Sequence, residues 1–163
     1  MNPIDFNINE NGSLPIESLP TRFSVITLRD IVIYPFMVYP VLLGREPSLR
    51  AAAYAGEHDK LVFLVAQKNP AIEEPGENDI FTDGTIAKII QIMKMPNGLM
   101  KILVDGIAQA SIDHYIQHDP FMMVEVKIHH EKIEISTEID ALVRQSTTLF
   151  EEYVQLSRNI PMD

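Results

Sequence analysis

Residues 28–48 read "LRDIVIYPFMVYPVLLGREPS", an apolar stretch that prolines interrupt at Pro35 and Pro40. From Ile31 to Leu43 it contains no charged residue. Because proline lacks a backbone N–H and keeps the preceding residue extended, we expect an extended, incompletely paired segment at the edge of a sheet or crossing over it. Two interpretations of its apolar side chains stay open: they plug a barrel, or they form a surface that binds another molecule.

The segments on either side predict a β-rich fold with one short helix. Residues 22–28 predict a strand from their β-branched content, and residues 60–68 predict a buried strand from a short apolar run. Residues 44–58 predict a helix, because Pro47 suits a first turn and the following alanines have high helix propensity. Gly56 is expected at the end of this helix.

Residues 85–95 and 99–112 predict the two strands of a long β-hairpin, because Pro96-Asn97-Gly98 between them is a strong turn signal. Gly106 in the second strand predicts a bulge or bend. Residues 121–129 predict a further strand. The apolar residues of the second hairpin strand share one parity, which predicts a single half-buried face made of Met100, Ile102, Val104, Ala108, Ala110 and Ile112.

Residues 138–158 predict a long helix with a wide apolar stripe. Thr137 is its predicted N-cap, with Asp140 in a position like that of a capping box. A helix cannot bury such a stripe on itself, so it is expected to pack on the β part, on later helices or on another subunit. The expected packing residues, which recur at helical spacing, are Leu142, Leu149, Phe150, Tyr153 and Leu156.

The order of these segments predicts three regions: an arm over residues 1–20, a β domain over residues 21–132, and a long helix over residues 133–163 that begins a helical part. The chain has 163 residues, of which 46 % are hydrophobic, so there is ample material for a core. The sequence ends shortly after the helix, which suggests a piece of a longer protein.

Charge and composition argue against several functions. The net charge is −10, from 13 basic and 23 acidic side chains, whereas a nucleic-acid binder normally presents a basic face. No apolar run approaches the ~18 residues of a membrane span. The N-terminus lacks the basic and apolar regions of a secretory signal. There is no cysteine, which excludes disulfides and thiolate metal sites, and a cytoplasmic location is expected.

Methionines cluster around the predicted hairpin turn. Met93 and Met95 precede the turn and Met100 follows it. Methionine adapts its shape and is frequent on promiscuous binding surfaces, so these residues either fill the core or form an apolar patch for exposed segments of other proteins. Met122 and Met123 are adjacent in a predicted strand, so they are expected to point to opposite faces.

The histidines and acidic runs predict no metal or catalytic site. His114 and His118 are four residues apart, but the surrounding sequence predicts strand and loop rather than helix. The acidic residues between 73 and 79 are interpreted as part of a solvated loop that spans residues 69–84. No nucleophile has an identifiable base.

Taken in order, the motifs resemble the N-terminal domain of the ATP-dependent protease Lon, and the match covers about residues 21–158. Where members of that family often have Leu-Pro, this sequence has Ile26-Thr27, a departure that affects only the local backbone. The matching motifs are Leu28-Arg29-Asp30, the segment with two prolines, Gly44-Arg45-x-x-Ser48, Gly84-Thr85-x-Ala87-Lys88, the hairpin, and Val104-Asp105-Gly106.

This resemblance implies an α+β fold, in which a β-rich PUA-like barrel with a short helix is followed by a long helix. It also implies a non-catalytic role in recognising unfolded or damaged proteins and in supporting hexamer assembly. In the parent protein an AAA+ ATPase using ATP and Mg, and a Ser-Lys serine protease domain, follow this region. The sequence has no Gly-x4-Gly-Lys-(Ser/Thr) loop, so neither activity and no cofactor is expected here.

The expected client-binding residues are apolar and lie in the segment with two prolines and in the hairpin: Tyr34, Pro35, Phe36, Met37, Tyr39, Met93, Met95 and Met100. Two alternatives remain. The domain could act mainly in oligomerisation and spacing, with incidental substrate contact, or it could read RNA as other PUA-like folds do, which its acidic charge opposes.

Overall fold

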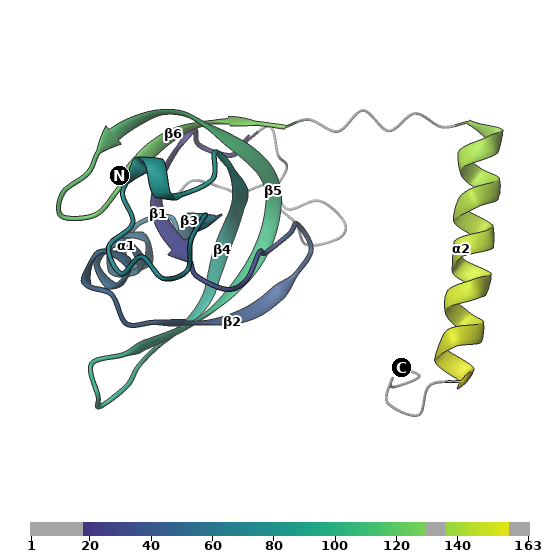
Figure 1. Cartoon of the computed structure of the whole chain (residues 1–163), viewed down its shortest axis with the longest axis horizontal. Coiled ribbons are helices and arrows are strands. Elements are labelled where there is room, and N and C mark those ends of the chain that lie inside the picture. Colours follow the sequence, from purple (N-terminus) through teal and green to yellow (C-terminus); the bar gives the residue numbers. More distant parts are fainter. Residues whose placement is uncertain (1–17, 130–135, 157–163) are drawn as a thin grey trace. The chain divides into compact units, whose positions relative to one another are not determined.

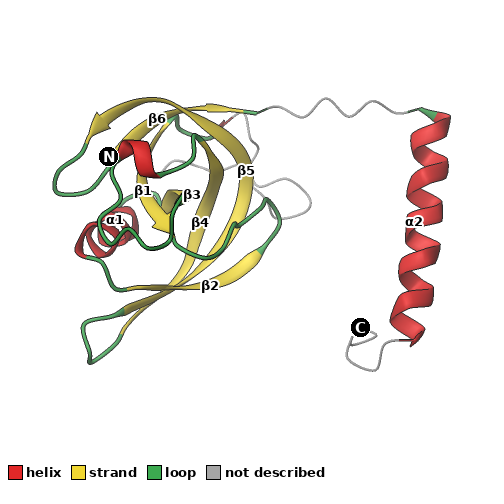
Figure 2. Cartoon of the chain, viewed as in Figure 1, coloured by secondary structure: helices red, strands yellow, loops and turns green. Residues whose placement is uncertain are grey.

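The computed structural model describes residues 18–129 and 136–156, and the chain divides into two compact units, residues 1–129 and 130–163. Most of the predicted arm therefore lies outside the described residues. The elements in chain order, drawn in Figures 1 and 2, are β1 (Arg22–Leu28), β2 (Val38–Leu43), α1 (Glu46–Glu57), β3 (Leu61–Ala66), the 3-10 helix η2 (Glu77–Asp79), β4 (Asp83–Lys94), β5 (Met100–Gln117), β6 (Met123–Ile128) and α2 (Thr137–Leu156).

The strands of the first unit form a closed barrel with one additional strand. The sheet order is β2-β5-β4-β3-β1-β6, and β5 also pairs with β6, so β5, β4, β3, β1 and β6 form a ring. The β1–β3 pair is parallel and the others are antiparallel. Among the described strands β2 pairs only with β5, so it is the edge strand. The predicted α+β fold, with a β-rich barrel, a short helix and a long helix, is confirmed.

The strands of the barrel are apolar on both faces because two cores flank them. In β1, Ile26 and Leu28 belong to the first core, while Phe23 and Val25 belong to the second core. The first core contains the alanines of α1 and the buried residues of β2, and the second contains the buried residues of β6. Burial on both faces explains why β1 and β3 are nearly continuous apolar runs rather than alternating ones.

The alternating burial predicted for the second hairpin strand is confirmed from Met100 to Ala110, but the buried parity serves two cores rather than one. Val104 faces the first core, whereas Ala108 faces the second. The reason is a bulge: Ala87 pairs with Gly106 and Ile86 pairs with Ala108, which leaves Ile107 as an extra residue. The bend predicted near Gly106 is thus present, and it transfers one parity of β5 from the first core to the second. The strand also continues to Gln117, beyond the predicted end.

Gly106 is the point at which the segment with two prolines meets the barrel. The Phe36 N–H donates to the Gly106 carbonyl oxygen at 2.8 Å, and the Gly106 N–H donates to the Met37 carbonyl oxygen at 2.9 Å. A Cβ atom at Gly106 would lie 2.3 Å from the Tyr34 carbonyl oxygen. Only glycine therefore permits this backbone approach.

The helices begin and end close to their predicted limits. Pro47 lies in the first turn of α1, and Gly56 lies in the last turn, where a Cβ would be 2.7 Å from the Ile92 Cδ1 atom. The predicted N-cap of α2 is wrong by one residue. The Ser136 hydroxyl accepts from the Ile139 N–H at 3.2 Å, and Asp140 pairs with Arg144 instead of capping the helix.

Within the described part of the chain, no helix combines the length and the apolar character that crossing a membrane requires.

We predict that Gly106→Ala lowers the free energy of unfolding by at least about 2 kcal/mol, because the new methyl group overlaps the Tyr34 carbonyl oxygen. Urea unfolding followed by circular dichroism measures the change. Gly76→Ala is the matched control, since its Cβ would lie 3.6 Å from the nearest atom and its φ is −90°. Equal stability of the two variants would contradict the close approach at Gly106.

Candidate functional site

The segment before β2 alternates between buried and exposed side chains. Ile33 is buried in the first core, and Ile31 and Met37 pack against the same core. The intervening side chains face outward and have large exposed fractions: Val32 50 %, Tyr34 53 %, Phe36 87 % and Val38 57 %. We call these four residues the outer row. One half of the segment thus fills the core, and the other half forms an apolar surface.

Local hydrogen bonds hold the segment in this arrangement. The Thr85 hydroxyl donates to the Ile33 carbonyl oxygen at 2.6 Å, in a buried position. A turn follows, in which the Met37 N–H donates to the Tyr34 carbonyl oxygen at 3.2 Å and the Met37 sulfur accepts from the Tyr34 N–H at 3.4 Å. Together with the two bonds at Gly106, these contacts fix the backbone from which the outer row projects.

Phe36 has an unusual backbone conformation. Its φ is +65°, in the left-handed region that bulky side chains rarely adopt, and its ring is the most exposed of the outer row. Such a conformation costs of order 1–3 kcal/mol and is typically found where function requires it. An exposed aromatic ring gains nothing from the fold in return, so Phe36 is the strongest candidate for contact with another molecule.

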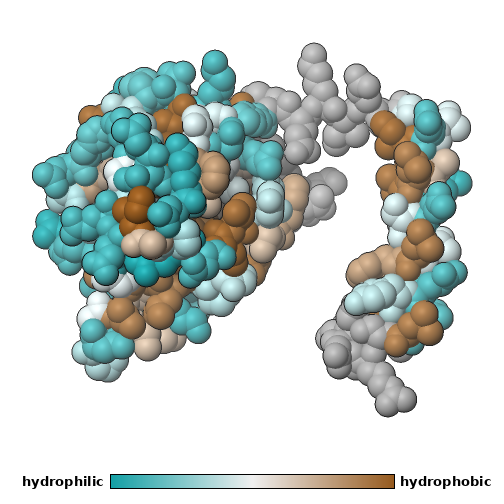
Figure 3. Space-filling view, in the orientation of Figure 1, coloured by the Kyte–Doolittle hydropathy of each residue, from teal (hydrophilic) through white to brown (hydrophobic). Residues whose placement is uncertain are grey.

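The outer face of β2 extends this surface toward the hairpin. Leu42 is exposed and lies opposite Lys101 of β5, which in turn lies opposite Met93 of β4. A lysine therefore separates Leu42 from Met93. In Figure 3, hydrophobic patches interrupt an otherwise hydrophilic surface along the lower part of the barrel, where Figure 1 places β2 and the hairpin.

The predicted client-binding residues divide into three groups. Tyr34, Phe36, Tyr39, Met93 and Met95 are exposed, and Pro35 and Met37 are half-buried. Met100 lies in the first core and is only 6 % exposed, so it does not belong to the surface. Sequence reasoning did not include Val32 and Leu42 among these residues. The alternation of inward and outward positions along the segment is the signal that identifies them.

Two neighbouring pockets share part of their lining. One, of about 650 Å³, is lined by β2 and by the residues that follow β1; the other, of about 700 Å³, lies at the start of α1. Thr27, Arg29 and Arg45 line both pockets.

Arg45 organises the wall that the pockets share. Its guanidinium donates to Gln67 Oε1 at 2.6 Å, to the Glu73 carbonyl oxygen at 3.2 Å and to the Thr27 carbonyl oxygen at 3.4 Å. Burial lowers the pKa of the Arg45 guanidinium from its ordinary value, and the nearby charge of Arg29 lowers it further.

Two histidines of the barrel lie against carboxylates of other elements. His114 Nε2 lies 3.1 Å from Glu125 Oε2, and His118 Nε2 lies 2.6 Å from Glu77 Oε1. Among the residues that the structure describes, no three His, Cys, Asp or Glu side chains are grouped as metal ligands. Burial, and secondarily the charge of Glu77, raises the pKa of the Tyr115 phenol.

Comparison with known proteins identifies the family of this chain. Residues 22–163 match the family model described as the ATP-dependent protease La (LON) substrate-binding domain. The chain belongs to the Lon substrate-binding domain family. The resemblance seen in the sequence motifs is therefore confirmed.

Curated relatives in this family are Lon proteases. Those of Endomicrobium trichonymphae, Desulforamulus reducens and Escherichia coli K12 are 37 %, 40 % and 39 % identical over 164, 146 and 147 residues. These alignments cover 100 %, 90 % and 90 % of this chain but 20 %, 18 % and 19 % of the relatives. The chain thus spans about a fifth of the length of these Lon proteases.

Two solved structures of Lon N-terminal domains have the same fold. The N-terminal domain of Mycobacterium avium complex Lon protease superposes with a TM-score of 0.64 at 24 % identity, covering 82 % of this chain and 68 % of that one. The Lon N-terminal domain protein of Xanthomonas campestris gives 0.59 at 14 % identity, covering 84 % and 75 %.

We predict that Phe36→Gly leaves the free energy of unfolding within about 0.5 kcal/mol of the parent value or raises it, because glycine adopts a positive φ without strain. Ile33→Ala in the same segment is expected to cost about 2–5 kcal/mol, because its side chain is buried. Urea unfolding of both variants tests the alternation. A large loss in Phe36→Gly would show that the ring packs against the fold.

Proposed function

We propose that this Lon-type domain binds apolar segments of unfolded or damaged proteins through the outer row and the exposed residues of β2. The observation that carries the proposal is the outer row itself. Its four apolar side chains project from a backbone that Thr85 and Gly106 hold in place. The name of the family, a substrate-binding domain, supports the same role.

The chemistry of the surface suits clients that share no sequence. Burial of apolar area contributes roughly 25 cal/mol per Å² and is not directional, so many apolar segments can occupy one surface. Folded proteins bury such segments, whereas unfolded proteins expose them. The absence of charge from Ile31 to Leu43 leaves the surface without electrostatic selectivity of its own. We therefore expect weak and promiscuous binding.

Weak binding becomes effective when several copies act together. In a hexameric parent protein, a client held by one domain meets the next at a raised effective concentration. In that setting the domain captures clients for ATP-dependent proteolysis in the cytoplasm, as part of protein quality control. It contributes recognition, and the ATPase and serine protease chemistry belongs to the other domains of the parent. The net charge of −10 disfavours nucleic acids as partners.

A second role, in assembly, is proposed for α2 on a separate observation. Seven large apolar side chains of this helix, between Ile139 and Leu156, are 44–86 % exposed, and none of the helix residues is buried. An apolar stripe of this length is normally covered in the working molecule. We propose that α2 packs against other helices of the parent protein or against neighbouring subunits, and so supports hexamer assembly.

The main proposal predicts that the chain binds a chemically denatured, labelled protein more tightly than the same protein in its folded form. Replacing Tyr34 and Phe36 together with serine should weaken this binding at least about tenfold, since an exposed aromatic anchor commonly contributes 1–2 kcal/mol or more. Fluorescence anisotropy measures both affinities.

Ile116→Ser provides the matched control, because Ile116 is an exposed apolar residue near the far end of β5. It should leave the affinity for the denatured protein unchanged. Equal affinity for the folded and denatured forms, or equal loss in the control, would refute the proposed role of the outer row.

The assembly role predicts that the chain self-associates at high concentration in analytical ultracentrifugation. Replacing Leu142, Leu149 and Leu156 with glutamine should abolish this association, because it removes the apolar stripe and changes no residue of the barrel. The thermal unfolding of the barrel should not change. Association that survives the triple substitution would contradict the role assigned to α2.

A further inference from the structure

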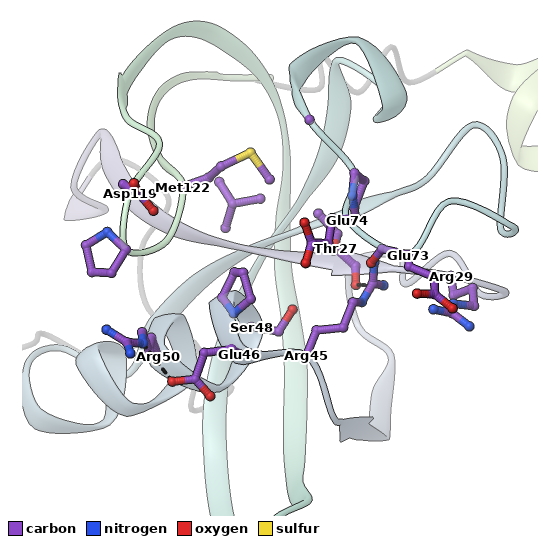
Figure 4. Close-up of a pocket in the computed structure, with 15 residues that line it drawn as sticks. Thr27, Arg29, Arg45, Glu46, Ser48, Arg50, Glu73, Glu74, Asp119 and Met122 are labelled. Atoms are coloured by element: carbon purple, nitrogen blue, oxygen red, sulfur yellow. Dashed lines mark hydrogen bonds and ion pairs between the residues drawn. The ribbon is translucent and has the colours of Figure 1, made fainter.

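The pocket at the start of α1 contains polar groups that have no partner. Ser48 is 5 % exposed and Thr27 is 8 % exposed, yet neither hydroxyl makes a hydrogen bond within the described part of the chain. Figure 4 shows the Ser48 side chain directed from α1 toward Arg45 and Thr27. Neither oxygen is sealed from solvent, so both hydroxyls are available in the pocket to a polar group of a ligand.

The first turn of α1 adds donors to the same pocket. No side chain caps this helix, and Pro47 removes one of its early amide donors. Glu46 and Ser48 both line the pocket, and their backbone N–H groups have no capping side chain. The helix has 12 residues, so its N-terminus carries a partial positive charge that favours an anionic group.

Guanidinium groups complete the arrangement. Arg29 lines the pocket and makes no hydrogen bond or ion pair among the described residues. Arg45 is committed to Gln67 and two carbonyl oxygens but still borders the cavity. An unpaired Arg29 beside two free hydroxyls and an uncapped helix end provides the donor set that binds a carboxylate.

Acidic side chains at the rim restrict the kind of anion that fits. Glu73, Glu74 and Asp119 line the pocket and are exposed, whereas Ser48 and Thr27 lie deep. Glu46 is already paired with Arg50 at 2.8 Å. The rim carboxylates would repel each charge of a polyphosphate. A single carboxylate with cationic or neutral neighbours would experience less repulsion at the rim.

We propose that this pocket binds one carboxylate of a polypeptide, either its free C-terminus or an acidic side chain. The adjoining pocket shares Thr27, Arg29 and Arg45 and is lined by Tyr39 and Leu42 of β2. An apolar residue next to the carboxylate would occupy that second pocket. The inference deepens the proposed function, because the ligand is a segment of the same unfolded clients, held by a polar as well as an apolar contact.

The test uses the whole chain and three N-acetylated octapeptides of leucine, alanine and one lysine. The first has a free C-terminal carboxylate, the second a C-terminal amide, and the third a C-terminal amide with aspartate in place of one alanine. Calorimetry at one moderate salt concentration measures their affinities. At least one of the two peptides that carry a carboxylate, the first or the third, should bind at least about five times more tightly than the second peptide. Charged hydrogen bonds in a partly exposed site imply an effect of this size.

Variants locate the carboxylate. Arg29→Gln and Ser48→Ala should remove the difference between the carboxylate and amide peptides. Arg22→Gln, which deletes the same charge on the exposed start of β1, should keep it. Because Arg29 is exposed and unpaired, its substitution leaves the fold intact even if the buried Ser48→Ala variant does not fold.

The outcomes separate this inference from the main proposal. A preference for only the first or only the third peptide identifies the C-terminus or the side chain as the source. Equal affinity of all three peptides, or a preference that survives Arg29→Gln, overturns the carboxylate site. If the carboxylate-dependent affinity does not change when Tyr34 and Phe36 are replaced with serine, the result would support this pocket and contradict the binding role proposed for the outer row.

Discussion

Two backbone hydrogen bonds at Gly106 fix the apolar segment to the barrel, and the rest of the surface depends on them. They require the chain at residues 34–37 to approach β5 so closely that no Cβ fits between the two backbones. The Thr85 hydroxyl, bonded to the Ile33 carbonyl oxygen, provides a second anchor from β4. The Gly-Thr and Val-Asp-Gly motifs of the sequence are thus structural: each contributes one of the contacts that hold the segment in place.

Once the backbone is fixed, its alternation divides the side chains between stability and binding. Ile33 and its inward neighbours complete the first core. Burial of these apolar side chains stabilises the segment in its observed register. The outward residues contribute little to that core, and Phe36 adds a strained backbone conformation. The hydrogen bonds at Gly106 and the inward packing of Ile33 offset this local cost. The exposed side chains of the uncharged edge strand, such as Tyr39 and Leu42, continue the apolar surface.

The sequence predicted the elements well because each carries a strong local signal, such as the turn at Pro96-Asn97-Gly98 or the alanines of α1. It did not predict the second core, since a bulge at Ile107 changes which face a residue meets without changing the apolar pattern. The same limit applies to the site. The amino-acid composition identified the apolar segment. Only the structure shows that the Phe36 side chain faces outward and that the Met100 side chain is buried. The sequence pattern did not indicate the hydroxyls of Ser48 and Thr27 beside α1, because their positions in the pocket depend on packing between distant segments.

The central claim is that clients contact the outward half of the segment that Gly106 anchors. A chemical-shift map of the labelled chain, titrated with an unfolded client, tests it most directly. The account predicts that the largest changes fall on Val32, Tyr34, Phe36 and Val38, and on the neighbouring residues of β2, while the inward Ile33 moves less. Changes confined to α2 or to the far end of β5, or no saturable change, would contradict it.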